Sequence, residues 1–281
     1  MIIYKKPALL SILSGALLTL SWPVQGLSFL VFFSLIPLFF IEDQITRENS
    51  KQKKLRLFAL NYLGFFIWNL GTTWWIVNSS VFGMVFAILC NTLFYAILMM
   101  LFHWSKKRLP LRTAYIFLVT LWIAFEKFHL EWDFSWPWLN LGNVFSEDIQ
   151  WIQWYEFTGS FGGTLWVLLI NIGLFEVFKN YPVSLKKTVW VKKMSPWFIG
   201  IAIPIVISLI LFERENNPIP NTEVLLLQPN IDPYNEKYDK ENDYYFDLLI
   251  DIIEAACWLL CGYPPSCSVL LLSLSHSGCR R

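Results

Sequence analysis

The side chains that can take part in the most kinds of chemistry in this sequence are cysteines, and four of the five lie near the C-terminus. A cysteine thiolate can act as a nucleophile or bind zinc. No histidine or further cysteine completes a zinc-ligand spacing around the pair Cys257 and Cys261, so we expect no metal and no cofactor. Disulfides in an oxidising compartment are an alternative for these two thiols together with Cys267 and Cys279. Cys90 lies in an apolar stretch and is interpreted as a packing residue.

The segment that carries these cysteines differs from the rest of the chain. From Ala255 to Arg281 it contains no acidic residue and no lysine. We interpret residues 255–281 as a non-native tail, produced by a truncation or a shifted reading frame near Glu254.

A second set of reactive side chains lies within long apolar stretches, where an unpaired polar group costs free energy in a membrane. We expect the asparagines there to form hydrogen bonds between helices. Glu126 and His103 lie near the ends of such stretches and are expected to reach water, whereas Glu176 is expected to pair with nearby lysines. The asparagines are Asn61, Asn69, Asn91 and Asn171.

Aromatic and acidic residues alternate between Lys127 and Glu156. Indole rings favour the headgroup level of a membrane, so this loop is expected at the membrane surface. Ser146 is expected to cap a short helix over residues 149–157. One interpretation is an ordinary aromatic belt; the other is an entrance for a lipid tail or lipidated substrate, with Trp136 and Trp138 as contacts.

The elements that must position these residues are membrane helices. The 281 residues are 56% hydrophobic and only 15% charged, which is unusual for a soluble domain. About 20 apolar residues cross a bilayer. Uncharged runs predict seven spans within residues 1–212: a hairpin of two helices, a pair divided at residues 78–80, and three single spans. The runs are Pro7–Ile41, Leu57–Phe102, Thr113–Phe125, Phe157–Phe175 and Met194–Phe212.

The lysines and arginines indicate the orientation, because cytoplasmic loops hold the excess of positive charge. Basic residues gather before residue 7 and in residues 42–56, 103–112 and 176–193, whereas residues 127–156 contain only Lys127. This pattern predicts a cytoplasmic N-terminus and an external C-terminus. A cleavable signal peptide is an alternative for the first thirty residues, but the chain lacks a small-residue cleavage site there.

A soluble segment is predicted after the last span. Residues 213–221 form a polar linker with two prolines, and Val224–Gln228 suits a short buried strand. Apolar residues between Tyr245 and Glu254 favour a helix. Residues 222–254 thus indicate the opening of an α/β domain that is too short to bury a core of its own.

Several motifs, in this order, resemble the bacterial apolipoprotein N-acyltransferase family. They are the first hairpin, Gly71-Thr72-Thr73-Trp74-Trp75, Trp136-Pro137-Trp138-Leu139-Asn140-Leu141-Gly142-Asn143, Gly159-Ser160-Phe161-Gly162-Gly163-Thr164 and the segment Val224–Tyr238. The resemblance covers residues 8–254. It implies that residues 222–254 begin a nitrilase-like domain, and it suggests Tyr238 as a further lipid contact.

The resemblance also implies a reaction and its partners. The family's enzymes lie in the bacterial inner membrane and take an acyl chain from a phospholipid onto a cysteine, as a thioester, assisted by a glutamate and a lysine. They then pass the chain to the N-terminal diacylglyceryl-cysteine of a lipoprotein. No nucleic acid is involved.

This sequence departs from the family at its catalytic motifs, since no residue here matches the glutamate, lysine or cysteine of the triad. We therefore expect a member of a membrane acyltransferase family whose 281 residues are inactive by themselves. A multi-pass transporter or a non-enzymatic membrane scaffold would show the same hydropathy and charge pattern, and both stay as alternatives.

Overall fold

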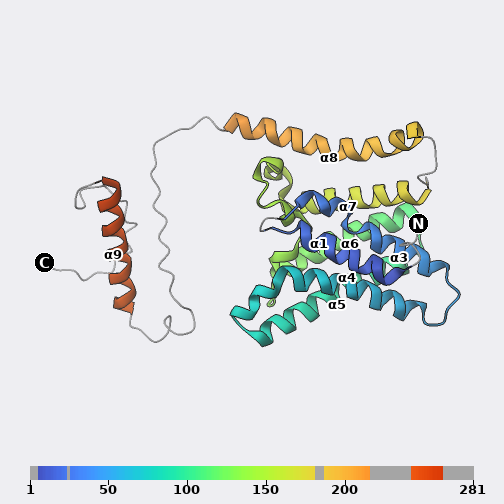
Figure 1. The fold of residues 1–281 in the computed structure, drawn as a ribbon, viewed down its shortest axis with the longest axis horizontal. Coiled ribbons are helices and arrows are strands. Elements are labelled where there is room, and N and C mark those ends of the chain that lie inside the picture. The colour runs from blue at the N-terminus through green and yellow to red at the C-terminus, as the bar shows by residue number, and fades with distance from the viewer. Residues whose placement is uncertain (1–5, 24–25, 181–186, 216–241, 262–281) are drawn as a thin grey trace. The chain divides into compact units, whose positions relative to one another are not determined.

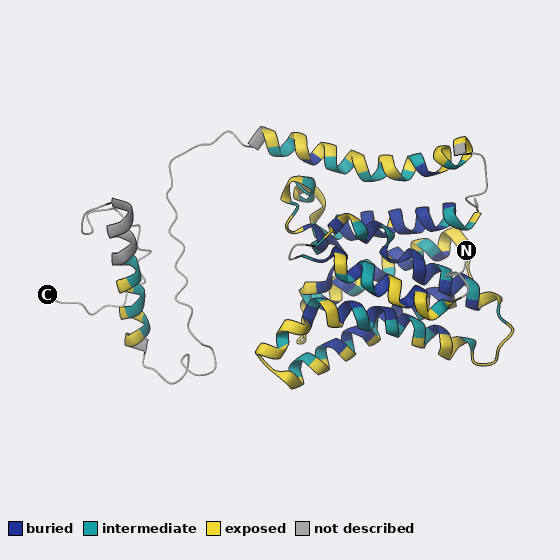
Figure 2. Ribbon diagram, in the orientation of Figure 1, coloured by how far each residue is buried: buried dark blue, intermediate teal, exposed yellow. Residues whose placement is uncertain are grey.

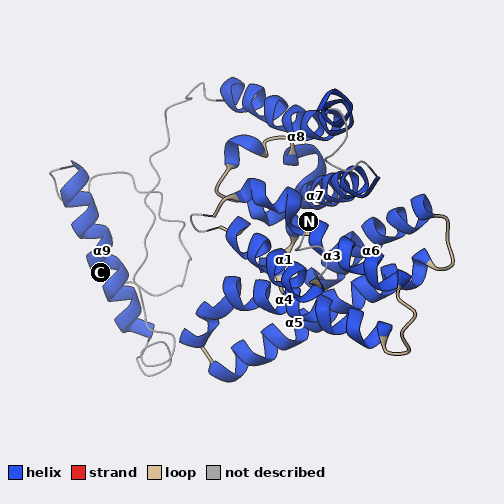
Figure 3. Ribbon diagram, turned by 45° about the vertical axis from the view of Figure 1, so that its right-hand side comes forward, coloured by secondary structure: helices blue, strands red, loops and turns tan. Residues whose placement is uncertain are grey.

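The computed structural model describes residues 6–23, 26–180, 187–215 and 242–261, and in these residues it contains helices and no strand (Figure 3). The chain divides into two units, residues 1–218 and 219–281. In the first unit, helices run back and forth through a bundle (Figure 1). Its helices are α1 (Pro7–Ser21), α2 (Val31–Ser34), α3 (Ile36–Arg47), α4 (Lys53–Thr73), α5 (Val81–Lys106), α6 (Leu111–Glu131), α7 (Tyr155–Asn180) and α8 (Lys187–Glu215).

Short 3-10 helices connect the longer ones. They are η2 (Ser28–Leu30), η3 (Trp74–Asn78), η4 (Pro137–Leu139), η5 (Leu141–Phe145) and η6 (Ile149–Trp151). We call the end of the bundle that carries residues 22–23, 26–27, 74–80 and 132–154 the loop end. The opposite end, with residues 42–56 and 103–112, is called the basic end.

Helices occupy every segment predicted to span the membrane. Five are long and apolar enough to do so: Ser28–Arg47, Val81–Lys106, Leu111–Glu131, Tyr155–Asn180 and Thr188–Glu213. Helix α1 is apolar but shorter, and α4 is not among the five. The described residues therefore contain five helices that could each cross a membrane, while a count of seven spans stays a prediction.

The interior of the bundle is built from large aromatic side chains. Trp68, Tyr95 and Trp122 are buried where α4, α5 and α6 meet, with ring centroids 5.0 Å apart for the first two and 5.3 Å for the last two. Figure 2 shows buried residues on the inward faces and exposed ones on the outward faces. The outward faces are themselves apolar, as at Phe82 and Phe86 of α5, which is what contact with lipid requires.

Small residues allow α1 and α4 to approach closely. A Cβ atom added at Gly15 would lie 2.5 Å from the carbonyl oxygen of Gly64, so no larger residue fits there. Thr19 of α1 also donates a hydrogen bond to the carbonyl of Ile67, at 3.3 Å. Close backbone contact through small residues is a usual way of packing helices in lipid.

The asparagines meet the prediction only in part. Asn171 of α7 accepts from the amide of Leu35 (2.9 Å) and donates to the carbonyl of Val31 (2.8 Å), and Asn91 bonds to His129 of the neighbouring helix. For these two the predicted interhelical bonds are confirmed. Asn69 instead donates within its own helix, and Asn61 has no partner among the described residues, so the prediction is wrong for both.

The second unit contributes helix α9 (Asn242–Cys261). It contains Tyr245–Glu254, so the predicted helix is confirmed there. The predicted strand at Val224–Gln228 lies outside the described residues.

Candidate functional site

A pocket of about 490 Å³ opens at the loop end of the bundle. Three segments that are distant in sequence form its wall: the end of α1, the junction of α4 with η3, and the loop that contains the turns η4 and η5. Pockets of this size are typical of small-molecule sites. The lining residues are Trp22, Pro23, Thr72, Thr73, Trp75, Pro137, Trp138, Asn143 and Ser146.

The wall is mainly apolar and aromatic, with a few hydrogen-bonding groups. The rings of Trp75 and Trp138 meet edge to face at 5.5 Å. Thr72 and Thr73 donate their hydroxyl protons to the carbonyls of Trp68 and Asn69, at 2.7 and 2.6 Å. The threonine oxygens are therefore left as acceptors, and an apolar ligand with a polar group at one end suits such a wall.

The turns that form one side of the pocket are held by side chains from helices α5 and α7 and by one side chain of the loop itself. Tyr95 of α5 donates to the carbonyl of Leu139 at 3.1 Å, and Tyr155 of α7 donates to the carbonyl of Gly142 at 2.9 Å. The side-chain amide of Asn143 bonds back to the carbonyl of Pro137 at 2.8 Å. These bonds fix the backbone of the loop at Pro137, Leu139 and Gly142.

Glycines permit this close fit between the loop and α7. Gly159 has φ +65°, a conformation that favours glycine, and it separates the first turn of α7 from the straight helix that follows. A Cβ atom at Gly142 would lie 1.9 Å from the carbonyl oxygen of Ser160. The glycine-containing motifs around residues 142 and 159–164 therefore pack directly against each other.

Glu126 does not reach water, contrary to the expectation from sequence. Its side chain is completely buried behind the pocket loop. It accepts hydrogen bonds from the amide of Leu141 (2.8 Å), the hydroxyl of Thr164 (2.6 Å) and the indole of Trp122 (3.1 Å). The position near a helix end misled the prediction, because the loop folds back over that end.

The short helix predicted over residues 149–157 is also wrong. Residues 149–151 form the 3-10 turn η6, and α7 begins only at Tyr155. Ser146 is the C-terminal cap residue of η5 and does not form the N-terminal cap of a following helix. The carboxylate of Asp148 accepts a hydrogen bond from Ser28, so this tertiary contact replaces the expected helix start.

The two predicted tryptophan contacts occupy different positions. Trp138 lines the pocket and is 52% exposed. Trp136 packs partly buried against the core, and its backbone amide donates to the carbonyl of His129 at 2.9 Å. Lipid contact by either residue stays a prediction. Tyr238 lies outside the described residues.

Sequence reasoning did not select Trp22, Thr72, Thr73 or Trp75 as site residues. The signal was present, because residues 71–75 and the turn of the first hairpin both belong to the motifs quoted above. Only the fold shows that these segments share one pocket with Trp138.

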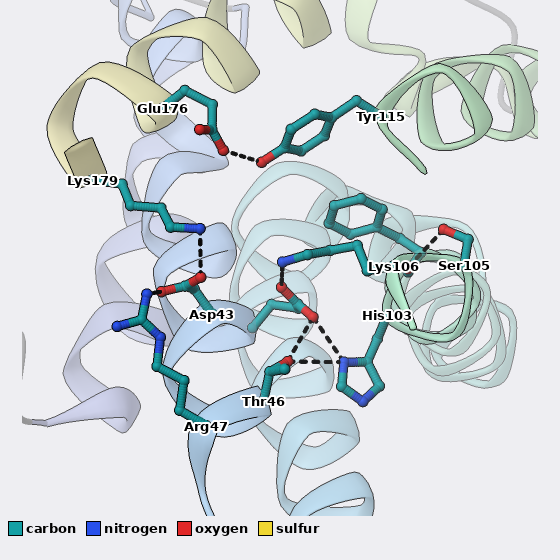
Figure 4. Close-up of polar contacts among 11 residues, drawn as sticks. Asp43, Thr46, Arg47, His103, Ser105, Lys106, Tyr115, Glu176 and Lys179 are labelled. Carbon is teal, nitrogen blue, oxygen red and sulfur yellow. Dashed lines mark hydrogen bonds and ion pairs between the residues drawn. The ribbon is translucent and has the colours of Figure 1, made fainter. Parts of the chain in front are cut away.

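A second polar cluster lies at the basic end (Figure 4). Glu42 of α3 is buried and contacts two residues of α5: the ring of His103, at 2.8 Å, and the ammonium of Lys106. His103 is only 3% exposed, so the expectation that it reaches water is wrong. The cluster ties α3 to α5 through a paired charge.

Neighbouring carboxylates in Figure 4 extend this network to α7. Asp43 pairs with Lys179 at 2.7 Å and with Arg47 at 2.6 Å. Glu176 accepts from the hydroxyl of Tyr115 and from Asn180, and no ion pair includes it in the part of the chain that the structure describes. The predicted charge pair at Glu176 is therefore wrong.

The two clusters offer different chemistry. At the basic end, the carboxylates of Glu42 and Asp43 are neutralised by cations, which is the arrangement of a structural tie between helices. The loop-end pocket has an open volume and unneutralised acceptors, but no cysteine in its wall. Cys90 lies half-buried within α5 and does not line it. Among the described residues, the wall thus offers aromatic surfaces and hydroxyl groups to a ligand.

Comparisons with known proteins agree with this division. A family model described as the apolipoprotein N-acyltransferase N-terminal domain matches residues 14–173, which contain all of the pocket residues. An apolipoprotein N-acyltransferase of Chlorobaculum tepidum is 28% identical over 239 residues, covering 83% of this chain and 43% of the relative. One of Geobacter metallireducens is 26% identical over 253 residues, covering 84% and 45%.

No solved structure matches the chain. The chain spans less than half the length of these two relatives. The family model covers more than half of the chain, and the curated relatives carry the same family name. The chain therefore belongs to the apolipoprotein N-acyltransferase family, and its membrane helices include the part that matches the family's N-terminal domain.

Proposed function

We propose that this chain forms the membrane domain of an enzyme that transfers an acyl chain from a phospholipid to the N-terminal diacylglyceryl-cysteine of lipoproteins. Within that reaction, the loop-end pocket receives an acyl chain of a lipid substrate. The observation that carries this proposal is the pocket itself, because its wall is built from residues 22–23, 72–75 and 137–146, which family motifs contribute.

The chemistry of the wall supports a lipid ligand. Trp75 and Trp138 offer large apolar surfaces, and Trp138 is half exposed at the rim of the pocket. Thr72 and Thr73 supply acceptor oxygens beside them. An acyl chain would bury its methylenes against the rings, and each buried methylene contributes about 0.8 kcal/mol.

The orientation follows from the charges. We propose that the basic end faces the cytoplasm and the loop end faces outward, in the inner membrane of a bacterium. Lys53, Lys54, Lys107 and Arg108 lie at the basic end, and burial together with the positive charges of the other three lowers the pKa of Lys107. Such crowding of positive charge is typical of the cytoplasmic side. The pocket would then open toward the compartment in which lipoproteins mature.

The catalytic step belongs to a nitrilase-like domain, of which residues 222–254 are proposed to be the start. In the family's mechanism, a cysteine takes the acyl chain as a thioester before the lipoprotein amine receives it. The 281 residues contain no match for that triad, so we propose that they bind lipid without transferring an acyl chain.

Photocrosslinking tests the lipid-binding part of this proposal. The chain is reconstituted in vesicles that contain phosphatidylethanolamine with a diazirine in its acyl chain, and labelled peptides are identified by mass spectrometry. We expect strong labelling of peptides that cover residues 72–75 and 136–146, and a reduction on Trp138→Ala. Trp104→Ala is the matched control, because Trp104 is 48% exposed at the basic end, away from the pocket. Equal labelling of all lipid-facing helices, unaffected by Trp138→Ala, would contradict the proposal.

A further inference from the structure

The most unusual charged residue in the first unit is Glu126, on helix α6. Its side chain is fully buried, and no ion pair includes it within the residues that the structure describes. Burying a carboxyl group in a membrane helix costs free energy unless other groups bond to it. The partners of Glu126 are three hydrogen-bond donors in place of a cation.

These partners use both oxygens of the Glu126 side chain as acceptors. The amide of Leu141, the indole of Trp122 and the hydroxyl of Thr164 all donate, so both carboxylate oxygens act as acceptors. A carboxyl group can accept at both of its oxygens, whereas a side-chain amide has only one acceptor oxygen.

Through these bonds, Glu126 reaches two consecutive residues of the pocket loop. Leu141 is bonded directly, at 2.8 Å. Gly142 donates its amide to the hydroxyl oxygen of Thr164 at 3.0 Å, and that same hydroxyl donates to Glu126. Thr164 therefore acts as a relay, and one carboxylate fixes the backbone of η5 against α6 and α7.

The anchored backbone continues directly into the pocket wall. Asn143 follows Gly142 and lines the pocket, and its side chain is bonded to the carbonyl of Pro137. Pro137 and Trp138 complete the same side of the wall. Glu126 itself does not line the pocket, so any effect that it has on a ligand passes through this loop.

We propose that Glu126 is a positioning residue whose carboxyl group holds the loop of residues 137–146 in the form that binds the lipid acyl chain. This rests on the proposed function for its ligand, but not for the anchoring of the loop. Without the carboxylate, the loop would sample other positions, and lipid binding would require that it be ordered first.

The test replaces the carboxylate by a group of the same shape. The glutamine of Glu126→Gln has one carbonyl oxygen in place of two carboxyl oxygens. It therefore cannot accept from Leu141 with one oxygen and from Thr164 with the other. Hydrogen exchange followed by mass spectrometry then reports the loop. We expect amide exchange in peptides that cover residues 139–146 to accelerate about tenfold, equivalent to about 1.4 kcal/mol, with no change in peptides from α4. If the glutamine variant fails to fold, Thr164→Val is the second variant. It removes the relay and should accelerate amide exchange in the same peptides.

Titration with the photoactivatable phospholipid separates positioning from general destabilisation. For Glu126→Gln we expect the half-saturating lipid concentration to rise about tenfold, while the labelling plateau and the midpoint of thermal unfolding stay near those of the unmodified chain. Glu176→Gln is the matched control, since this α7 carboxylate also accepts from a hydroxyl but lies at the basic end. It should leave both the exchange and the titration unchanged.

The outcomes distinguish the two proposals. Unchanged exchange in residues 139–146 would overturn the role of Glu126, as would faster exchange with an unchanged lipid titration. If the unmodified chain shows no pocket labelling, the proposed lipid site is overturned, and the exchange result alone decides whether Glu126 anchors the loop.

Discussion

Replacing Gly142 by alanine should disturb the pocket loop, because the added methyl group has no room beside α7. The added Cβ would lie 1.9 Å from the carbonyl oxygen of Ser160 and 3.2 Å from the amide nitrogen of Thr164. Both are backbone atoms of α7 and cannot rotate away. The distance to the Ser160 oxygen must increase to about 3.4 Å before the contact becomes ordinary, so the loop or the helix has to move.

That movement costs free energy in two ways. Overpacking in a close-fitting interior destabilises by about 1–3 kcal/mol. The shift also stretches the hydrogen bond from the Gly142 amide to Thr164 (3.0 Å) and the one that Tyr155 donates to the Gly142 carbonyl (2.9 Å). We therefore expect Gly142→Ala to lower the free energy of unfolding by about 2–3 kcal/mol, toward the upper part of the overpacking range.

Unfolding by sodium dodecyl sulfate, followed by tryptophan fluorescence in mixed micelles, measures this difference. Gly83→Ala is the matched control, because the nearest atoms to its added Cβ belong to the side chain of Ser80, at 3.3 Å. Gly83 lies in the first turn of α5, where alanine should change stability by less than about 1 kcal/mol. Equal stability of Gly142→Ala and the unmodified chain would refute the reasoning, and so would an equal loss in both variants.

Further predictions concern orientation and the polar ties between helices. In a cysteine-free background, a cysteine at Ser79 should react with a membrane-impermeant thiol reagent outside intact cells and one at Ser50 should not; the opposite pattern would reverse the orientation. Asn171→Leu should cost about 1–2 kcal/mol in the same detergent titration, because it removes two bonds to the first hairpin; an unchanged midpoint would show that they contribute nothing. Glu42→Ala should cost about 3–5 kcal/mol by leaving the largely buried Lys106 unpaired, whereas Arg47→Ala, at an exposed side chain, should cost at most about 1 kcal/mol; equal losses would contradict this difference. Finally, the 281 residues expressed in cells depleted of their own N-acyltransferase should leave lipoproteins diacylated, as read by mass spectrometry of their N-termini; a triacylated product would overturn the proposed inactivity.

The positions of the helices were predictable from the sequence because they depend on local properties. Long uncharged runs must be helical in lipid, since each backbone polar group has to be satisfied within its own segment. The runs found in the sequence correspond to α1–α8, and the pattern at Tyr245–Glu254 corresponds to α9. The family was likewise recognisable, since its motifs are short, ordered and contiguous.

The pairing of polar groups was decided only by the tertiary structure. Asn171 bonds to Leu35 and Val31, which precede it by 136 and 140 positions in the sequence, and Glu126 bonds to Thr164, 38 positions further along. Proximity to a helix end suggested water for Glu126 and His103, but neighbouring segments bury both. A polar group in a membrane takes whichever partner the fold brings near it, and local sequence does not contain that information.

The same reason limited the candidate site. The sequence by itself determined that residues 127–156 are rich in tryptophan and that residues 71–75 and 159–164 carry motifs. Only the tertiary structure decided that Trp138 lines a pocket with Trp22 and Trp75 while Trp136 packs inward. Composition fixes which side chains a membrane domain has available, whereas the close approach of backbones at Gly142 and Ser160 determines which of them share a cavity.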